Sequence, residues 1–140
     1  MSGIGPDPGP GVFLEQHLRR LHALALPLRD TSSRAAADAL RRALRLHASI
    51  EERICFPSIL SARIPFAGEV VAAARTSRGA LLEALDGSRG PDVAARLDAY
   101  ASFEEHRLLP LFAALPGVTL REMALEIQEL LGSRGRARGA

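Results

Sequence analysis

Cysteine is almost absent from this chain, which has one Cys among its 140 residues. One Cys excludes an intrachain disulfide and is typical of proteins from a reducing compartment. Long apolar runs are absent too, since no stretch approaches the roughly 20 residues that a membrane-spanning helix needs. Residues 1–11 lack the basic region and following apolar region of a signal peptide. We therefore expect a cytoplasmic protein that does not associate with membranes.

Tryptophan is absent and aromatic residues make up 4% of the chain, whereas hydrophobic residues make up 47%. Most of the hydrophobic residues are Ala and Leu rather than β-branched residues, and Arg and Glu are frequent. These residues favour helix over strand. A chain of this length buries roughly 70% of its unfolded surface as one domain, so the composition predicts a single all-α domain.

Several motifs that mark enzyme classes are absent from the sequence. It has no Ser/His/Asp or Cys/His nucleophile arrangement, no glycine-rich loop to cradle a phosphate and no dinucleotide-binding fingerprint. The formal charge is only +2, and Arg134, Arg136 and Arg138 lie in a Gly-rich C-terminal segment. This segment is either a solvated tail or a nucleic-acid-binding arm. We favour the tail and expect no nucleic-acid partner, because no aromatic residues interleave with the arginines to stack on bases.

The spacing of apolar residues predicts four long helices and a short fifth helix at the C-terminus. Residues 1–11, rich in Gly and Pro, are expected to form a flexible lead, and residues 133–140 a basic disordered tail. Between them, residues 12–132 should form an up-down-up-down four-helix bundle, because short connections join the helices. The expected helices cover about 12–26, from 30–33 to about 56, about 67–85, from near 91 to the turn at 116–117, and about 119–131.

One stretch, residues 47–57, carries the strongest chemical signal. His47 and Glu51 are four residues apart, so on a helix both side chains project from one face. That face is otherwise apolar and includes Leu40 and Leu44. A buried imidazole with a buried carboxylate needs a partner, because an uncompensated ion costs several kcal/mol. A metal ion is one such partner, and these ligand types suit iron, manganese or zinc.

The same stretch recurs 53 residues later, as residues 100–110, with five of eleven positions identical. The two Glu and the Pro keep their spacing, whereas Tyr100 replaces His47. Such a repeat predicts two similar helices in one bundle. A further imidazole lies on the apolar stripe of the first helix. We therefore expect five polar side chains to converge in the core, namely His17, His47, Glu51, Tyr100 and Glu104.

With these residues in place, the chain resembles the hemerythrin-like family of HHE cation-binding domains. The shared pattern is a His on the first helix, His-x-x-x-Glu and then Phe-Pro on the second, and a Glu followed by a Pro on the fourth. The resemblance covers about residues 12–115. The residues that carry it are His17, His47, Glu51, Phe56, Pro57, Glu104 and Pro110.

This resemblance implies a non-haem metal, most readily iron, in the core of the bundle. His17 and His47 would be nitrogen ligands, and Glu51 and Glu104 would be carboxylate ligands. O₂, peroxide or NO would bind as an exogenous ligand, so the implied function is binding or sensing of such a molecule, or metal handling. An enzymatic reaction with peroxide or NO is compatible with the pattern but is not required by it.

Two positions depart from the family pattern. Arg75 and Tyr100 stand where the family has the histidines of the third and fourth helices, and no His lies between positions 48 and 105. The family's second metal loses its nitrogen ligands, which leaves a mononuclear and a di-iron centre both open. Tyr100 is either a packed core tyrosine or a phenolate ligand in the metal site. Arg75 either points inward to pair with a glutamate or lies on the surface.

A second hypothesis, from a different class, is a metal-free helical bundle that serves as a regulatory or protein-interaction module. Inward pairing of Arg75 with Glu51 or Glu104 would support it, because the guanidinium would stand in for the missing cation. Metal analysis of the purified protein distinguishes the two hypotheses.

Overall fold

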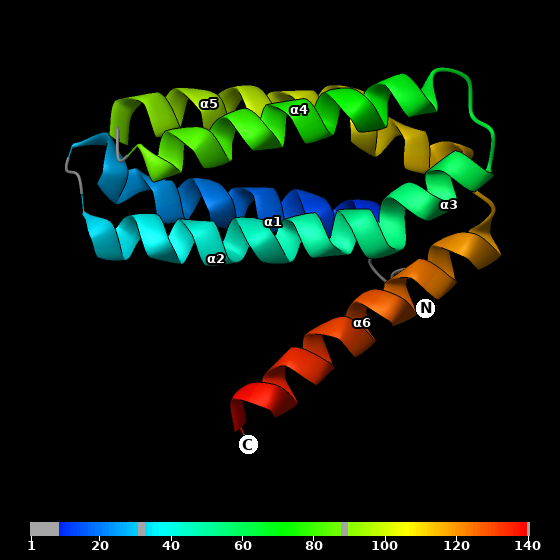
Figure 1. The fold of residues 1–140 in the computed structure, drawn as a ribbon. Coiled ribbons are helices and arrows are strands. Elements are labelled where there is room, and N and C mark those ends of the chain that lie inside the picture. The colour runs from blue at the N-terminus through cyan, green and yellow to red at the C-terminus, as the bar shows by residue number, and fades with distance from the viewer. Residues whose placement is uncertain (1–8, 31–32, 88–89, 140) are drawn as a thin grey trace, which may run out of the picture.

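Four antiparallel helices lie side by side in the computed structural model of the chain, which describes residues 9–30, 33–87 and 90–139 (Figure 1). They confirm the predicted all-α four-helix bundle, and no strand occurs within these ranges. None of the described helices is long and apolar enough to cross a membrane. The four helices are α1 (Pro10–Ala25), α2 (Arg34–Ile50), α4 (Ala67–Asp86) and α5 (Gly90–Phe103).

The local sequence explains how the first two helices begin. α1 starts at Pro10, where the missing N–H of proline sacrifices no intrahelical hydrogen bond. Pro10 and Gly11 were expected in the flexible lead but belong to α1, and residues 1–8 of that lead lie outside the described residues. Ser33 caps α2, because its Oγ accepts a hydrogen bond of 3.2 Å from the N–H of Ala36. The 3₁₀ helix η1 (Leu26–Arg29) connects α1 towards α2.

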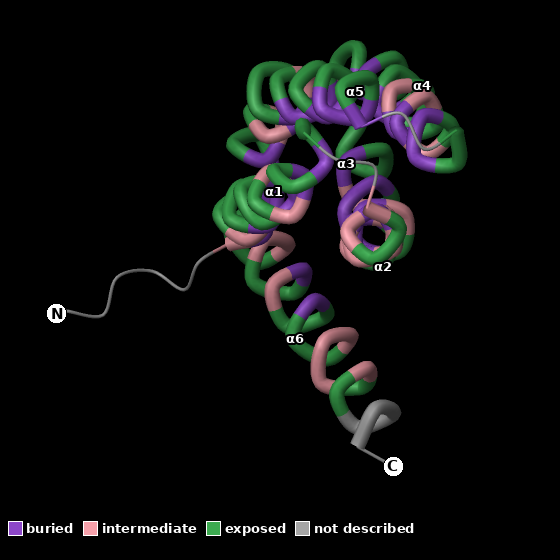
Figure 2. Tube along the Cα trace, turned by 90° about the vertical axis from the view of Figure 1, so that its left-hand side faces the viewer, coloured by how far each residue is buried: buried purple, intermediate pink, exposed green. Residues whose placement is uncertain are grey.

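Each helix turns a buried stripe towards the axis of the bundle, as Figure 2 shows in a view along that axis. The buried apolar side chains form two clusters, one towards each end of the bundle. Along α4 the change from one cluster to the other falls between Ala74 and Leu81. Buried polar and charged side chains occupy the layer between the clusters. They are His17, His47, Glu51, Arg78 and Glu104.

Two of the long helices, α2 and α5, are each followed directly by a π turn. α2 leads through the π turn η2 (Glu51–Cys55) into α3 (Phe56–Ser61), which passes the predicted end near residue 56 and leaves α2 at an angle (Figure 1). α5 continues through the π turn η3 (Glu104–Leu108) into the 3₁₀ helix η4 (Leu109–Ala114). The two π turns therefore fall at equivalent positions of the repeated stretches, residues 47–57 and 100–110.

A proline after each π turn explains its position. Pro57 and Pro110 lack an N–H, and their rings would clash with the carbonyl four residues earlier in a regular α-helix. A π turn relieves the clash, because its N–H groups bond to the carbonyl five residues earlier instead of four. The N–H groups of Phe56 and Leu109 each bond to the carbonyl of the glutamate five residues earlier. The repeat therefore encodes a backbone irregularity that begins at the glutamate in each copy.

The predicted fifth helix is present as α6 (Gly117–Gly139), but it is 23 residues long and passes the expected end near residue 131. Met123 and Ile127 of α6 are buried against one end of the bundle. The described part of the expected disordered tail, residues 133–139, is helical instead. No proline interrupts this segment, and Arg134 remains partly covered. The second half of α6 leads away from the four-helix bundle (Figure 1).

Candidate metal centre

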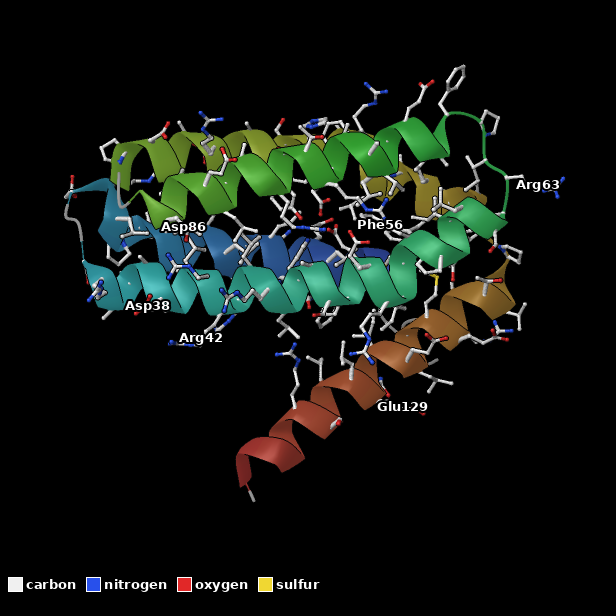
Figure 3. The ribbon with its side chains drawn as sticks, in the orientation of Figure 1. Asp38, Arg42, Phe56, Arg63, Asp86 and Glu129 are labelled. Atoms are coloured by element: carbon white, nitrogen blue, oxygen red, sulfur yellow. The ribbon has the colours of Figure 1, made fainter. Side chains whose placement is uncertain are left out.

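The polar layer brings together side chains from all four long helices of the bundle. Side chains that carry nitrogen and oxygen atoms lie between the helices (Figure 3). All five residues predicted to converge are buried there, and a sixth, Arg78, joins them. His17 comes from α1, His47 and Glu51 from the α2 segment, Arg78 from α4, and Tyr100 and Glu104 from the α5 segment.

His47 lies at the centre of the layer and is fully buried. Its Nε2 is 2.9 Å from Glu104 Oε1 and 3.4 Å from Glu51 Oε2. The opposite ring nitrogen, Nδ1, is 3.0 Å from Nδ1 of His17. The two imidazole rings stack with centroids 5.2 Å apart. One face of the His47 ring is thus supported by His17, while its Nε2 is directed to both glutamates.

The two glutamates leave polar atoms unsatisfied. Glu51 Oε1 accepts hydrogen bonds of 3.0 Å from Arg78 Nη1 and 3.0 Å from the Tyr100 hydroxyl. Glu51 Oε2 and Glu104 Oε2 are buried and have no hydrogen-bond partner among the described residues. Buried carboxylate oxygens without a partner are costly, because they have lost their hydration. These two oxygens therefore call for a cation or a proton.

A metal ion fits these residues. One ligand atom each from His47, Glu51 and Glu104 can be chosen so that all three lie within 4.8 Å of one another. One imidazole nitrogen with two carboxylate oxygens is a donor set for iron, manganese or zinc. An ion held by this triad would also satisfy the two carboxylate oxygens that lack a partner. In the described part of the chain, no other group of at least three His, Cys, Asp or Glu residues meets this distance test.

His17 lies outside this triad, although the resemblance implied that it is a ligand. Its Nδ1 is directed to Nδ1 of His47, across the ring from the nitrogen that faces the glutamates. Burial and the charge of the neighbouring His47 together lower the pKa of His17 to about 4. A neutral His17 can accept a hydrogen bond from the Nδ1–H of His47. That bond would leave the Nε2 of His47 directed to the carboxylates.

Arg75 takes the outward position that the sequence left open. Its Nε and Nη2 donate hydrogen bonds of 2.9 and 2.7 Å to the two carboxylate oxygens of Glu52, and half of its side chain is exposed. Its guanidinium also lies 5.3 Å above the centroid of the Phe56 ring. Arg75 therefore does not reach Glu51 or Glu104, and the inward pairing considered for it is wrong.

Arg78, one turn further along α4, makes the inward pairing instead. Its Nη1 is 3.0 Å from Glu51 Oε1, and its Nη2 is 2.6 Å from Glu52 Oε2. The sequence contained a signal for this residue, because Arg78 lies on the apolar stripe between Ala74 and Leu81. Alignment to the family pattern pointed to Arg75, whereas the helical spacing of buried residues points to Arg78.

Tyr100 is a hydrogen-bond donor in this geometry. Its hydroxyl lies 3.0 Å from Glu51 Oε1, and its ring packs edge-on against His47 with centroids 5.9 Å apart. Burial raises the pKa of Tyr100 well above its usual value, and the charges of Glu51 and Glu104 add to the rise. The arrangement matches the core tyrosine with a hydrogen-bonded hydroxyl rather than a phenolate.

The surroundings shift the pKa values of the two glutamates in opposite directions. Burial and the adjacent Glu51 together raise the pKa of Glu104 to about 8. Burial also opposes ionisation of Glu51, but the adjacent His47 and Glu104 side chains and the charge of Arg78 lower its pKa to about 2. For His47, burial lowers the pKa, but the neighbouring Glu104 and Glu51 carboxylates outweigh this and raise it to about 9. A cation that binds here must therefore displace protons from His47 and Glu104.

A groove between α1 and α2 leads to this layer from the surface. It has a volume of about 500 Å³, and His17 lines it. Arginines surround it, and Arg42 points from α2 away from the bundle axis on this side (Figure 3). A small molecule that enters here meets His17 before it meets His47. The lining residues are His17, Arg20, Leu24, Ala39, Arg42, Ala43, Arg45, Leu46 and Arg134.

Comparison with known proteins adds no relative, since no protein-family model, no curated protein and no solved structure matches this chain.

Proposed function

We propose that this chain is a hemerythrin-like metal-binding protein that holds iron in the core of its bundle and binds or senses O₂, peroxide or NO. One observation carries the proposal: His47, Glu51 and Glu104 converge in a fully buried layer where two carboxylate oxygens have no hydrogen-bond partner among the described residues. We include a cytoplasmic location in the proposal, because the single cysteine, Cys55, is free and buried.

Three side chains would hold the ion. His47 would contribute Nε2, and Glu51 and Glu104 would each contribute a carboxylate oxygen. Iron held by this set would supply a redox-active centre with positions left for a small exogenous ligand. His17 would orient the His47 ring, and Arg78 with Tyr100 would orient the Glu51 carboxylate.

The surroundings favour a small ligand. Apolar clusters close the layer on both sides along the bundle axis. His17, with 8% of its surface exposed, separates the groove between α1 and α2 from His47. A diatomic molecule or peroxide is small enough to pass when the His17 side chain moves. A larger metabolite could enter only if the helices separated.

The test is the metal content of the protein after reconstitution with Fe(II) under anaerobic conditions and removal of unbound metal. We expect stable binding of iron, followed by a change in the absorption spectrum when O₂ or NO is added. His47→Ala and Glu104→Gln should each lose tight binding, because each removes one of three ligands on rigid helices. The matched controls are His106→Ala and Glu105→Gln, which alter exposed residues next to Glu104 and should keep the metal.

A metal-free regulatory or protein-interaction module is the second candidate. It is favoured by the donors already aimed at the glutamates: Arg78 and Tyr100 bond to Glu51, and His47 bonds to Glu104. A proton retained by Glu104 would then replace the cation. This candidate becomes the better one if the folded protein retains no iron, manganese or zinc after reconstitution, or if the ligand variants retain as much metal as the controls.

A further inference from the structure

We propose that the core of this bundle has two related halves, of which one can hold a metal ion and the other is permanently filled by the Arg78 guanidinium and the Tyr100 hydroxyl. The proposal rests on the proposed metal binding and adds to it the number of ions and the groups that limit it. The centre would hold one ion per chain.

The internal repeat defines the two halves. His47 and Glu51 in the first copy correspond to Tyr100 and Glu104 in the second. The hydrogen bonds run crosswise between the copies: His47 Nε2 lies 2.9 Å from Glu104 Oε1, and the Tyr100 hydroxyl lies 3.0 Å from Glu51 Oε1. Each glutamate also begins a π turn of the same kind. The same backbone positions therefore carry an imidazole in one half and a phenol in the other.

Each of the two halves also includes one helix from outside the repeat stretches. α1 packs on α2 and supplies His17 beside His47, while α4 packs on α5 and supplies Arg78 near Tyr100. One half thus has two imidazoles, of which His47 faces the glutamates and can bind a metal through its deprotonated Nε2. The other half has a guanidinium, which stays protonated in proteins and has no lone pair to offer.

Arg78 is held in place by two carboxylates. Its Nη1 bonds to Glu51 Oε1 at 3.0 Å and its Nη2 to Glu52 Oε2 at 2.6 Å, and only 11% of its side chain is exposed. Arg75 fixes Glu52 from the outside through a bidentate pair. A second metal ion next to Glu51 Oε1 would meet a buried positive charge that cannot move away without breaking this network.

The ligand atoms left for a metal ion are those that Arg78 and Tyr100 do not bind. Glu51 uses Oε1 for Arg78 and Tyr100, so its Oε2 is the oxygen left for a metal. His47 Nε2 faces this oxygen, and Glu104 Oε2 also has no hydrogen-bond partner among the described residues. Three donors, His47 and Glu51 of the first copy and Glu104 of the second, are therefore available together on the side of His47, which suits one ion.

The decisive experiment measures Mn(II) and Fe(II) bound per chain at equilibrium in the wild type and in the double variant Arg78→His/Tyr100→His. The double variant removes the fixed charge and supplies two imidazoles in the second half. We expect about one ion per chain in the wild type and about two in the double variant. Arg75→His is the matched control, because it makes the same change one turn earlier on the exposed side of α4, and it should keep one ion.

The outcomes separate this inference from the proposed function. Two tightly bound ions in the wild type, or a folded double variant with one ion, overturn the inference and leave metal binding intact. No bound ion in the wild type overturns the proposed function and the inference with it. If the double variant does not fold, electron paramagnetic resonance of the Mn(II)-loaded wild type decides: we expect the signal of an isolated ion, and an exchange-coupled pair would overturn the inference.

Discussion

Arg78 and Glu51 form a buried ion pair, with 3.0 Å between Nη1 and Oε1, in the polar layer where α4 meets the second helix of the bundle. The pair places a permanent positive charge beside the fully buried Glu51 carboxylate. It also determines which oxygen of Glu51 remains for a metal ion. The stability of the bundle and its proposed capacity for metal would therefore depend on the same contact.

Arg78→Met should lower the free energy of unfolding by about 3–5 kcal/mol in chelator-treated protein, because it leaves Glu51 buried without its charge partner. Urea unfolding followed by circular dichroism measures this. Arg75→Met is the matched control, and its exposed ion pair with Glu52 should contribute about 0–1 kcal/mol. Equal losses for the two variants would show that Arg78 does not stabilise the core charge.

His17→Gln should weaken metal binding by about 10- to 100-fold without abolishing it, because His17 supports the His47 ring rather than facing the triad. His47→Ala should abolish tight binding, because it removes a ligand. Competition with a chelator of known affinity measures both. A loss for His17→Gln as complete as that for His47→Ala would show that His17 is itself a ligand, as the family resemblance implied.

Tyr100→Phe should leave the bound iron and its visible spectrum unchanged, because the hydroxyl donates to Glu51 instead of binding as a phenolate. The free energy of unfolding should fall by about 1–2 kcal/mol, the cost of one lost hydrogen bond to a charged acceptor. Absorption spectroscopy of the oxidised, iron-loaded protein is the measurement. A purple to brown charge-transfer band in the wild type that disappears in Tyr100→Phe would establish the phenolate instead.

The sequence predicted the bundle well because its helices follow the ordinary periodicity of buried apolar residues. α4 (Ala67–Asp86) lies within a residue of its expected end, since Pro65 and Gly87 leave little doubt about where regular helix is possible. α6 was predicted too short, because the arginines and glycines near the C-terminus resemble a disordered tail in composition. Composition alone does not show that a helix already begun can continue through them.

The sequence predicted which residues converge at the candidate site, but not which of their atoms make contact. The repeat identified Glu51 and Glu104, and helical phase placed both in the core. Helical phase does not determine which ring nitrogen of a histidine faces a neighbour. The contact between Nδ1 of His17 and Nδ1 of His47 was therefore not predictable. The π turns also escaped prediction, although a proline late in each repeat stretch is their physical cause. Arg78 was not predicted, because a charge favours the surface unless it is paired, and its partner Glu51 lies on another helix.

The stability of the bundle should depend on pH through His47 and Glu104. His47 and Glu104 have folded-state pKa values of about 9 and about 8, above their ordinary values of 6.5 and 4.5. Groups with raised pKa values stabilise the fold below the unfolded pKa, and this stability is lost as pH rises through the folded pKa. Chelator-treated protein should therefore lose a few kcal/mol of unfolding free energy between about pH 6.5 and 9, at about 1.4 kcal/mol per pH unit for each proton involved.

Two other groups determine the acidic side of this profile. The pKa of His17 is lowered to about 4, so its contribution to stability rises with pH up to about 6.5 and offsets the early loss from Glu104. The pKa of Glu51 is lowered to about 2, so its contribution is lost as pH falls below about 4.5. Stability should therefore be greatest at about pH 4.5–6.5. Urea unfolding across pH 4–9 measures the profile.

Glu104→Gln provides the sharpest check of this profile. The amide resembles the protonated carboxyl, so the variant should fold at pH 6 and should lose less stability than the wild type between pH 6.5 and 9, because only His47 then titrates in that range. Glu105→Gln, on the exposed neighbour, should keep the wild-type slope. Stability that stays level or rises from pH 6.5 to 9 in the wild type would mean that the core does not retain these protons, and that a cation would not have to displace them.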